Sequence, residues 1–170
     1  MRLRHVAATV ALSIFSIVCG AKAHAQTAIY AQVTGQSNDL TSGNGYFWGP
    51  TFGIYHDSHS LALVHIGYDV RGSILKNGSA QFSSGLGGIR ASVVPHVIPI
   101  KIYAEGLGGV GFISNGSSST NFQYQINGGV EYTLLPHIDW RALEVAYNGY
   151  SGNTGGNPVA LSTGIVFRLF

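Results

Sequence analysis

The feature that most constrains the fold is an alternation of apolar and polar residues at every second position. It is clearest in the segments 64–71, 100–105, 122–132 and 161–169. Successive side chains of a β-strand point to opposite faces, whereas a helix would repeat its apolar residues every three to four positions. The chain therefore folds into strands that have one apolar and one polar face.

Turn signals rich in Gly, Pro, Asn and Ser divide the chain into eight candidate strands. These are the segments 28–34, 45–56, 61–73, 80–93, 100–113, 121–134, 140–149 and 159–170. A tilted strand needs roughly 9 to 11 residues to cross a bilayer, and only the first segment is shorter. We therefore expect strands long enough to span a membrane.

The connections between these segments alternate in character. Four are polar and rich in Gly, Ser and Asn, namely 35–44, 74–79, 114–120 and 150–158, whereas 57–60, 95–99 and 135–139 are short and carry Pro or His. Long loops on one side and short turns on the other are typical of outer-membrane barrels. An open sheet edge in hydrocarbon would leave backbone groups unpaired, at several kcal/mol each. The fold class predicted is all-β, an eight-stranded antiparallel up-and-down transmembrane β-barrel.

Pro50 conflicts with an uninterrupted strand because proline cannot donate a ladder hydrogen bond. We expect either a bulge at Pro50 or a strand that pairs only after Thr51. The aromatic residues Tyr46 and Trp48 fall near one predicted rim, and Tyr132 and Trp140 near the other. Aromatic girdles at the two membrane interfaces are typical of such barrels, and ordinary strand packing is the alternative explanation.

Residues 1–25 have the pattern of a secretory signal peptide. Arg2 and Arg4 form the positive region, an apolar stretch covers 6–18, and Ala-His-Ala at 23–25 is a cleavage site. We predict export through the Sec signal, cleavage after Ala25 and a barrel domain covering 26–170. Acylation of Cys19 as a lipoprotein is the alternative, but the small residue expected before that cysteine is missing.

The composition limits the functions that the mature chain can have. Charged residues make up 9% of the sequence, against ~25% in ordinary soluble domains. Three of the nine Lys and Arg residues lie in the leader, which leaves six against seven Asp and Glu, a net charge of −1. A nucleic-acid partner is therefore not expected. Because the only cysteine is Cys19, neither a disulfide nor a cysteine metal site is expected in the barrel.

Charged residues on the predicted strands fall on the polar face, which would line the barrel interior. The interior of an eight-stranded barrel is just wide enough for side chains to fill, and charges buried there need partners. We predict an interior polar network that plugs the lumen. Its members are Asp69, Arg71, Arg90, Glu105, Glu131 and Glu144, with Lys101 and Arg168 on the same face.

Other chemical signals are weak. The run 106–111 matches the dinucleotide-binding pattern GxGxxG, and Glu131 follows at a distance suited to a ribose contact. The residues after this run cannot begin the helix that such a site needs. We therefore expect these glycines to lie in a strand. Two network carboxylates as a catalytic acid and base would need a cleft that nothing in the sequence marks. After the leader, the histidines lie at or near predicted turns or, for His65, inside, and none has metal-ligand spacing: His56, His59, His65, His96 and His137. We predict no catalytic, cofactor-binding or metal-binding residue.

The signal peptide, the eight alternating segments and the terminal segment 161–170, which ends in Phe170, together resemble a known family. This is the family of small outer-membrane barrels that includes the OmpA transmembrane domain, OmpX and porin-family barrel-domain proteins. The resemblance covers the mature chain. The family has hydrophobic residues two and four positions before the last residue. This chain departs from that pattern, because those positions hold Arg168 and Val166 and the apolar alternation runs through Phe167 and Leu169.

The resemblance implies location in the cell outer membrane, contact with outer-membrane lipid and lipopolysaccharide, recognition by the barrel-assembly machinery and a monomeric state. We expect a structural or surface-interaction role. Two alternatives stay open: narrow porin-like transport of small molecules, and an outer-membrane lipid-modifying enzyme. A soluble lipocalin-like barrel, with its apolar face inside, is the architectural rival. If the apolar face is outside, Val64→Arg or Ile102→Arg near the midplane should cost ~2 to 4 kcal/mol.

Overall fold

A computed structural model of the chain describes residues 26–37, 45–61, 64–95, 98–114, 118–151 and 156–169. The predicted signal peptide at 1–25 and the terminal Phe170 lie outside these ranges, so leader, cleavage and domain boundary stay predictions. Within the described ranges, no helix is both long and apolar enough to cross a membrane.

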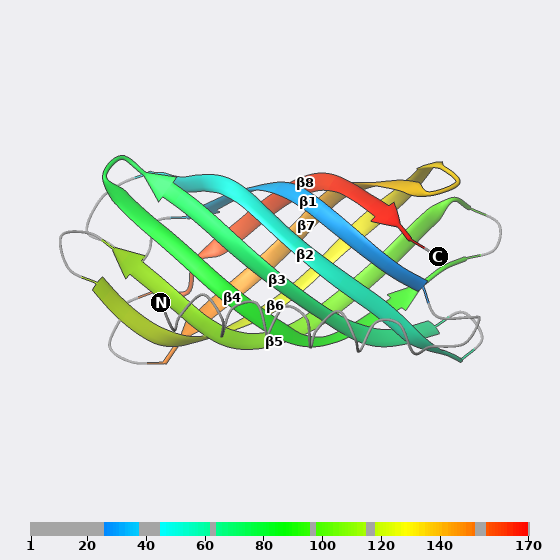
Figure 1. The fold of residues 1–170 in the computed structure, drawn as a ribbon, viewed down its shortest axis with the longest axis horizontal. Helices are drawn as coiled ribbons and strands as arrows, with labels where there is room; N and C mark the ends of the chain where they lie inside the picture. Colours follow the sequence, from blue (N-terminus) through cyan, green and yellow to red (C-terminus); the bar gives the residue numbers. More distant parts are fainter. Residues whose placement is uncertain are drawn as a thin grey trace, which may run out of the picture.

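Eight antiparallel strands form one closed barrel, in which each strand pairs with the next along the chain and β8 pairs with β1 (Figure 1). The strands are β1 (Gln26–Ser37), β2 (Tyr46–Leu61), β3 (Val64–Asn77), β4 (Ala80–Val93), β5 (Ile100–Ser114), β6 (Ser118–Leu135), β7 (Ile138–Tyr150) and β8 (Val159–Arg168). The predicted fold class is confirmed. We call the end with the β1–β2, β3–β4, β5–β6 and β7–β8 connections the loop end, and the opposite end the turn end.

The barrel is sealed between its first and last strands. The β1–β8 register runs from Ala28 opposite Arg168 to Gln36 opposite Ala160. Figure 1 shows the start of β1 beside the end of β8. No strand edge is therefore left at this seam, as the cost of unpaired backbone in hydrocarbon requires.

Several strand boundaries differ from the prediction, most of all in β1, β2 and β3. β1 has 12 residues, not seven, so it is not short. The turn expected at 57–60 belongs to β2, which continues to Leu61 with a register shift between Asp57 and His59. The polar loop expected at 74–79 is a two-residue turn at Gly78 and Ser79, because Asn77 already pairs with Ala80. Gly78 has a φ of 59°, which favours glycine.

The bulge expected at Pro50 does not form. Pro50 lies in register with Val33 of β1, so the strand already pairs before Thr51. On the side of β2 that faces β3, Gly49 and Pro50 have no ladder partner. Pairing continues from Thr51, opposite Ser73, in the same register as Trp48 opposite Lys76. The missing proline N–H is therefore accommodated by a two-residue gap in one ladder instead of an inserted residue.

The apolar face of the strands lies outside and the polar face inside, the reverse of a lipocalin-like barrel. Ile89, with 68% of its surface exposed, and Ile126, with 62%, stand on the outer surface, whereas Asp69 and Arg90 are fully buried in the interior. Exposed aromatics lie at both ends: Tyr46 and Trp48 begin β2 at the loop end, and Tyr132 pairs with Trp140 near the turn end.

Candidate functional site

The centre of the barrel is filled by charged side chains. The structure brings together all six residues assigned to the interior network, and each is at most 4% exposed. They come from β3, β4, β5, β6 and β7. With Arg141 they form what we call the charged layer: Asp69, Arg71, Arg90, Glu105, Glu131, Arg141 and Glu144. The outcome is a cross-section occupied by side chains.

Each arginine of the charged layer is shared by at least two carboxylates. Arg71 donates from Nε to Asp69 at 3.0 Å and from Nη1 to Glu144 at 2.8 Å, and it also contacts Glu105. Arg90 bridges Glu105 and Glu131, the latter at 3.3 Å. Charges at this depth persist only when they are paired and hydrogen-bonded, and the shared arginines meet that requirement.

Arg141 lies in the middle of the layer, although the sequence pattern did not indicate it. Its guanidinium contacts Glu131 at 2.7 Å and Glu144 at 3.1 Å. Arg141 and Glu144 are three positions apart, so a regular strand would place them on opposite faces. A register shift between Arg141 and Glu144, against β8, turns both inward. Asp139, two positions before Arg141, also faces inward, although the sequence pattern placed Asp139 in the turn at 135–139.

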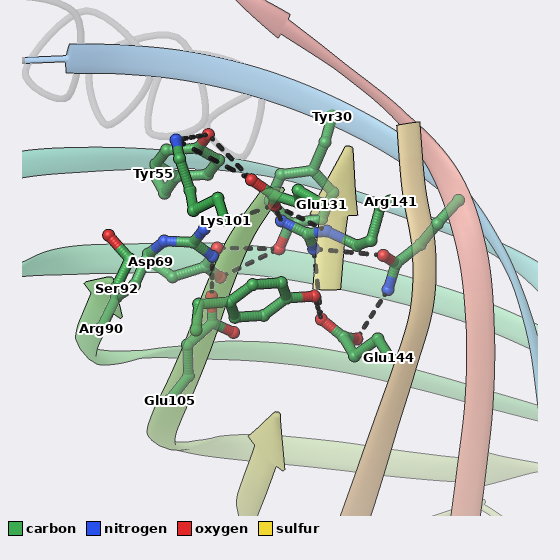
Figure 2. Close-up of polar contacts among 12 residues, drawn as sticks. Tyr30, Tyr55, Asp69, Arg90, Ser92, Lys101, Glu105, Glu131, Arg141 and Glu144 are labelled. Atoms are coloured by element: carbon green, nitrogen blue, oxygen red, sulfur yellow. Dashed lines mark hydrogen bonds and ion pairs between the residues drawn. The ribbon is translucent and has the colours of Figure 1, made fainter. Parts of the chain in front are cut away.

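Tyrosine rings and arginine guanidinium groups alternate through the layer (Figure 2). The carbon of the Arg90 guanidinium lies 4.0 Å from the ring centres of both Tyr55 and Tyr103. That of Arg141 lies 4.0 Å from the Tyr30 ring and 4.7 Å from the Tyr103 ring. Such cation–π contacts strengthen when they are desolvated, to ~2 kcal/mol or more. The stack therefore holds the arginines in place beyond their ion pairs.

The same tyrosines donate hydrogen bonds to the carboxylates. Tyr30 donates to the two oxygens of Asp69 at 3.0 and 2.9 Å, and Tyr103 donates to Glu144 at 2.8 Å. Each ring is thus bound at its face by an arginine and at its hydroxyl by an acid. The alternation in 100–105 places Tyr103 on the polar face with Lys101 and Glu105, as the structure has it. The stacking of tyrosines on arginines has no signal in the spacing.

Two inward glycines make room for these rings. Gly53 lies opposite Tyr30 in the register, and Gly129 lies opposite Tyr103. A Cβ atom at Gly53 would lie 2.4 Å from Cζ and Oη of Tyr30, and one at Gly129 would lie 2.5 Å from the Tyr103 hydroxyl. The rings therefore lie across the neighbouring strand where no side chain stands.

We expect Gly53→Ala to lower the free energy of unfolding by about 1 to 3 kcal/mol, since the added methyl overpacks a ring that is fixed on both sides. Urea unfolding of the refolded protein in lipid would measure the change. Gly106→Ala is the matched control, because a Cβ there meets no atom within 4 Å and should leave stability nearly unchanged. Equal effects of the two substitutions would contradict the close fit of Tyr30 against Gly53.

Uncharged polar side chains fill the lumen on the loop side of the charged layer. Thr34 hydrogen-bonds Thr51 and Ser162, each at 2.9 Å, and Thr51 hydrogen-bonds Ser73 at 2.8 Å. The space left between these side chains is ≈ 10 Å³ for the centre of a water molecule. That is room for about one water.

Apolar side chains pack together in the lumen near the loop end, on one side of the barrel. We call this the apolar layer: Phe47, Leu75, Ala80 and Phe82, from β2, β3 and β4. Ile113 and Tyr150 pack against it, and the Phe82 and Tyr150 rings meet edge to face with centres 6.0 Å apart. Along β3, the inward residues Leu75, Ser73 and Arg71 therefore lead from the apolar layer, through the hydroxyl groups, to the charged layer.

Further charged side chains of the interior lie toward the turn end. The Lys101 amine donates to Gln26 at 2.8 Å and lies 3.9 Å from Glu131, and Arg168 pairs with Asp139 at 3.2 Å. Arg168 is 20% exposed, so it lies less deeply than the charged layer. Both residues thus extend the interior polar face toward the turn end.

The histidines and the glycine-rich motif show no assembled site. In the described ranges, no three His, Cys, Asp or Glu side chains are grouped to hold a metal ion. His56 lies in β2, as the predicted strand 45–56 has it, and hydrogen-bonds Thr27 at 2.8 Å. His96 and the side chain of His59 lie outside the described part. Residues 106–111 run within β5, as expected for strand glycines.

Comparison with known proteins identifies the fold. No family model and no characterised protein sequence matches the chain. Among solved structures, Neisserial surface protein A is 17% identical with a TM-score of 0.58, covering 85% of this chain and 97% of that one. A major outer membrane protein from Thermus thermophilus is 12% identical with a TM-score of 0.53, covering 86% and 100%. The outer membrane enzyme PagL is 14% identical with a TM-score of 0.50, covering 84% and 99%. The resemblance to small outer-membrane barrels is confirmed for the fold.

Proposed function

We propose that the chain is an integral outer-membrane β-barrel protein with a structural or surface-interaction role and a lumen filled by side chains. The observation that carries the proposal is the charged layer, in which seven buried side chains from five strands occupy the centre of the barrel. The apolar layer at the loop end supports it. Among the described residues, both layers consist of inward side chains that are buried.

The outer surface supports a membrane location. Large apolar side chains such as Val33, Phe52, Ile89 and Ile126 are more than half exposed on different strands. Soluble monomers rarely expose apolar patches beyond a few hundred Å². A lipid environment removes this cost, and exposed aromatics at both rims match the interfacial girdles of membrane barrels. Export by the Sec signal and insertion by the barrel-assembly machinery complete the proposal.

Planar-bilayer recording tests the filled lumen. We expect no steady conductance from the purified, folded protein, because an ion crossing the charged layer would have to displace paired buried groups. A band that migrates differently before and after boiling would show that the protein in the sample is folded. Steady single-channel currents from such a sample would instead favour the porin-like alternative.

The enzyme alternative is raised by the structural likeness to PagL, an outer membrane enzyme. A lipid-modifying enzyme would change the mass of lipid A in cells that express the chain. We expect identical lipid A mass spectra with and without the gene. A shifted lipid A peak that requires the gene would replace the structural role with this one.

A further inference from the structure

One charged side chain stands apart from the interior network. Among the described residues, Lys76 alone carries a charge on the outer surface, where it is exposed near the loop end of β3. In the register it lies between Trp48 of β2 and Gln81 of β4. Accepting the proposed membrane location, Lys76 therefore stands at the outer rim of the apolar belt, beside an interfacial aromatic ring.

A groove of ≈ 480 Å³ opens on the same face. Gly72 of β3 and Gly85 of β4, register partners, lie on its floor, and Phe52 and Phe112 from the flanking strands line it. A Cβ atom at Gly85 would meet nothing within 4 Å, so the floor is open to the outside. In Figure 1 the strands that form this face, β2 to β5, cross the front of the barrel.

The cation and the groove are aligned along β3. Residues 72, 74 and 76 of β3 face outward, and Ile74 is a lining residue of the groove. At ~3.3 Å per residue, Lys76 lies about 7 Å further toward the loop end than Ile74. Gln81, opposite Lys76, adds an amide at the same rim. The face therefore offers a positive charge at the rim and an apolar channel that leads from it into the belt.

We propose that this face binds one membrane lipid with an anionic phosphate headgroup, whose phosphate contacts Lys76 and whose acyl chain lies in the Gly72–Gly85 groove. The inference rests on the proposed membrane location and adds to it a specific site. A groove within hydrocarbon that is lined mainly by apolar side chains is filled by acyl chain and not by water. A second copy of the chain is disfavoured, because no described outward residue is acidic and could pair with Lys76 across an interface.

Native mass spectrometry of the folded protein with added phosphatidylglycerol or phosphatidylcholine tests the site. We expect preferential retention of phosphatidylglycerol, and about fivefold weaker retention by Lys76→Gln, the loss expected for one lysine near an anionic lipid surface. Gly85→Leu should fill the groove and reduce retention of both lipids. Gly106→Leu is the matched control, since its added side chain also meets open space but lies outside the groove.

The outcomes separate this inference from the proposed function. Equal loss in Gly85→Leu and Gly106→Leu, or unchanged retention in Lys76→Gln, would overturn the site even when all variants show heat-dependent mobility and insert into vesicles. Failure of the wild-type chain to insert into vesicles would overturn the membrane proposal itself. Rapid disulfide dimers of a leaderless Ser83→Cys variant in bilayers would replace the lipid with a second copy.

Discussion

Arg141→Ala is expected to lower the free energy of unfolding by about 3 to 5 kcal/mol. The substitution takes one partner from Glu131 and one from Glu144, which then keep only Arg90 and Arg71 as arginine partners. Two arginines then face the four carboxylates of the charged layer, and an uncompensated buried charge is far costlier than an intact pair is stabilising. It also removes the guanidinium that stacks on the Tyr30 and Tyr103 rings. Urea titration of the protein refolded in vesicles, followed by tryptophan fluorescence, would measure the change.

Arg168→Ala is the matched control for this prediction. It also removes an arginine from an ion pair with a carboxylate, Asp139, but its side chain is 20% exposed. Asp139 is buried, but Arg168 is partly solvated, so water can take the place of the guanidinium and the loss should stay at ~1 kcal/mol. We therefore expect the Arg141 variant to lose several times more stability. Similar losses in the two variants would contradict the prediction that the charged layer contributes more to the free energy of unfolding than the partly exposed pair does.

Ile126→Arg is expected to cost about 2 to 4 kcal/mol of stability in a bilayer, the depth-dependent cost of an arginine on a barrel's lipid face at the midplane. Ile126 is the ninth of 18 residues in β6 and is 62% exposed on the outer surface. The same vesicle-based unfolding measurement applies. In a soluble barrel an exposed isoleucine would tolerate arginine within ~0.5 kcal/mol, so the size of the effect tests the environment.

Depth supplies the control. Val64 is the first residue of β3 and Ile102 is the third residue of β5. Both therefore lie near an end of a strand and not near the midplane, so the depth predicted from the sequence was wrong. Near an interface the cost of an arginine falls to ~0 to 1 kcal/mol. We therefore expect Val64→Arg to be much milder than Ile126→Arg. Equal costs at the two depths would contradict a bilayer around the described strands.

The strand number, the closure and the orientation of the two faces follow from the sequence because they depend only on period-two alternation and on the cost of an open edge. The prediction of a loop at 74–79 was wrong because polar residues are also found at strand ends near a rim. Lys76 and Asn77 pair with β4 within the β3–β4 hairpin. The prediction of a turn at 57–60 was wrong because Asp57 is a buried residue of β2, and the strand continues beyond it to Leu61. Polarity alone does not separate a turn from an interior position.

The charged positions of the interior were accessible from the pattern, but their arrangement was not. Arg141 and Glu144 both face inward only because the register shifts between them, and a shift is set by pairing with β6 and β8 and not by local sequence. The tyrosine and arginine stack joins β1, β2, β4, β5 and β7, so it depends on the barrel's diameter and on glycines across the strand. Such features arise from tertiary geometry, which one-dimensional spacing cannot encode.

The seam between β1 and β8 has a kinetic consequence. Gln32 of β1 donates to Glu144 of β7 at 2.9 Å and accepts from Arg141 at 3.2 Å, so these bonds reach across β8. They can form only when the two ends of the chain have met, the contact with the largest loop-closure cost. Interactions made after the rate-limiting barrier chiefly slow unfolding. Removal of the Gln32 side chain should therefore raise the unfolding rate of the barrel and leave its folding rate nearly unchanged.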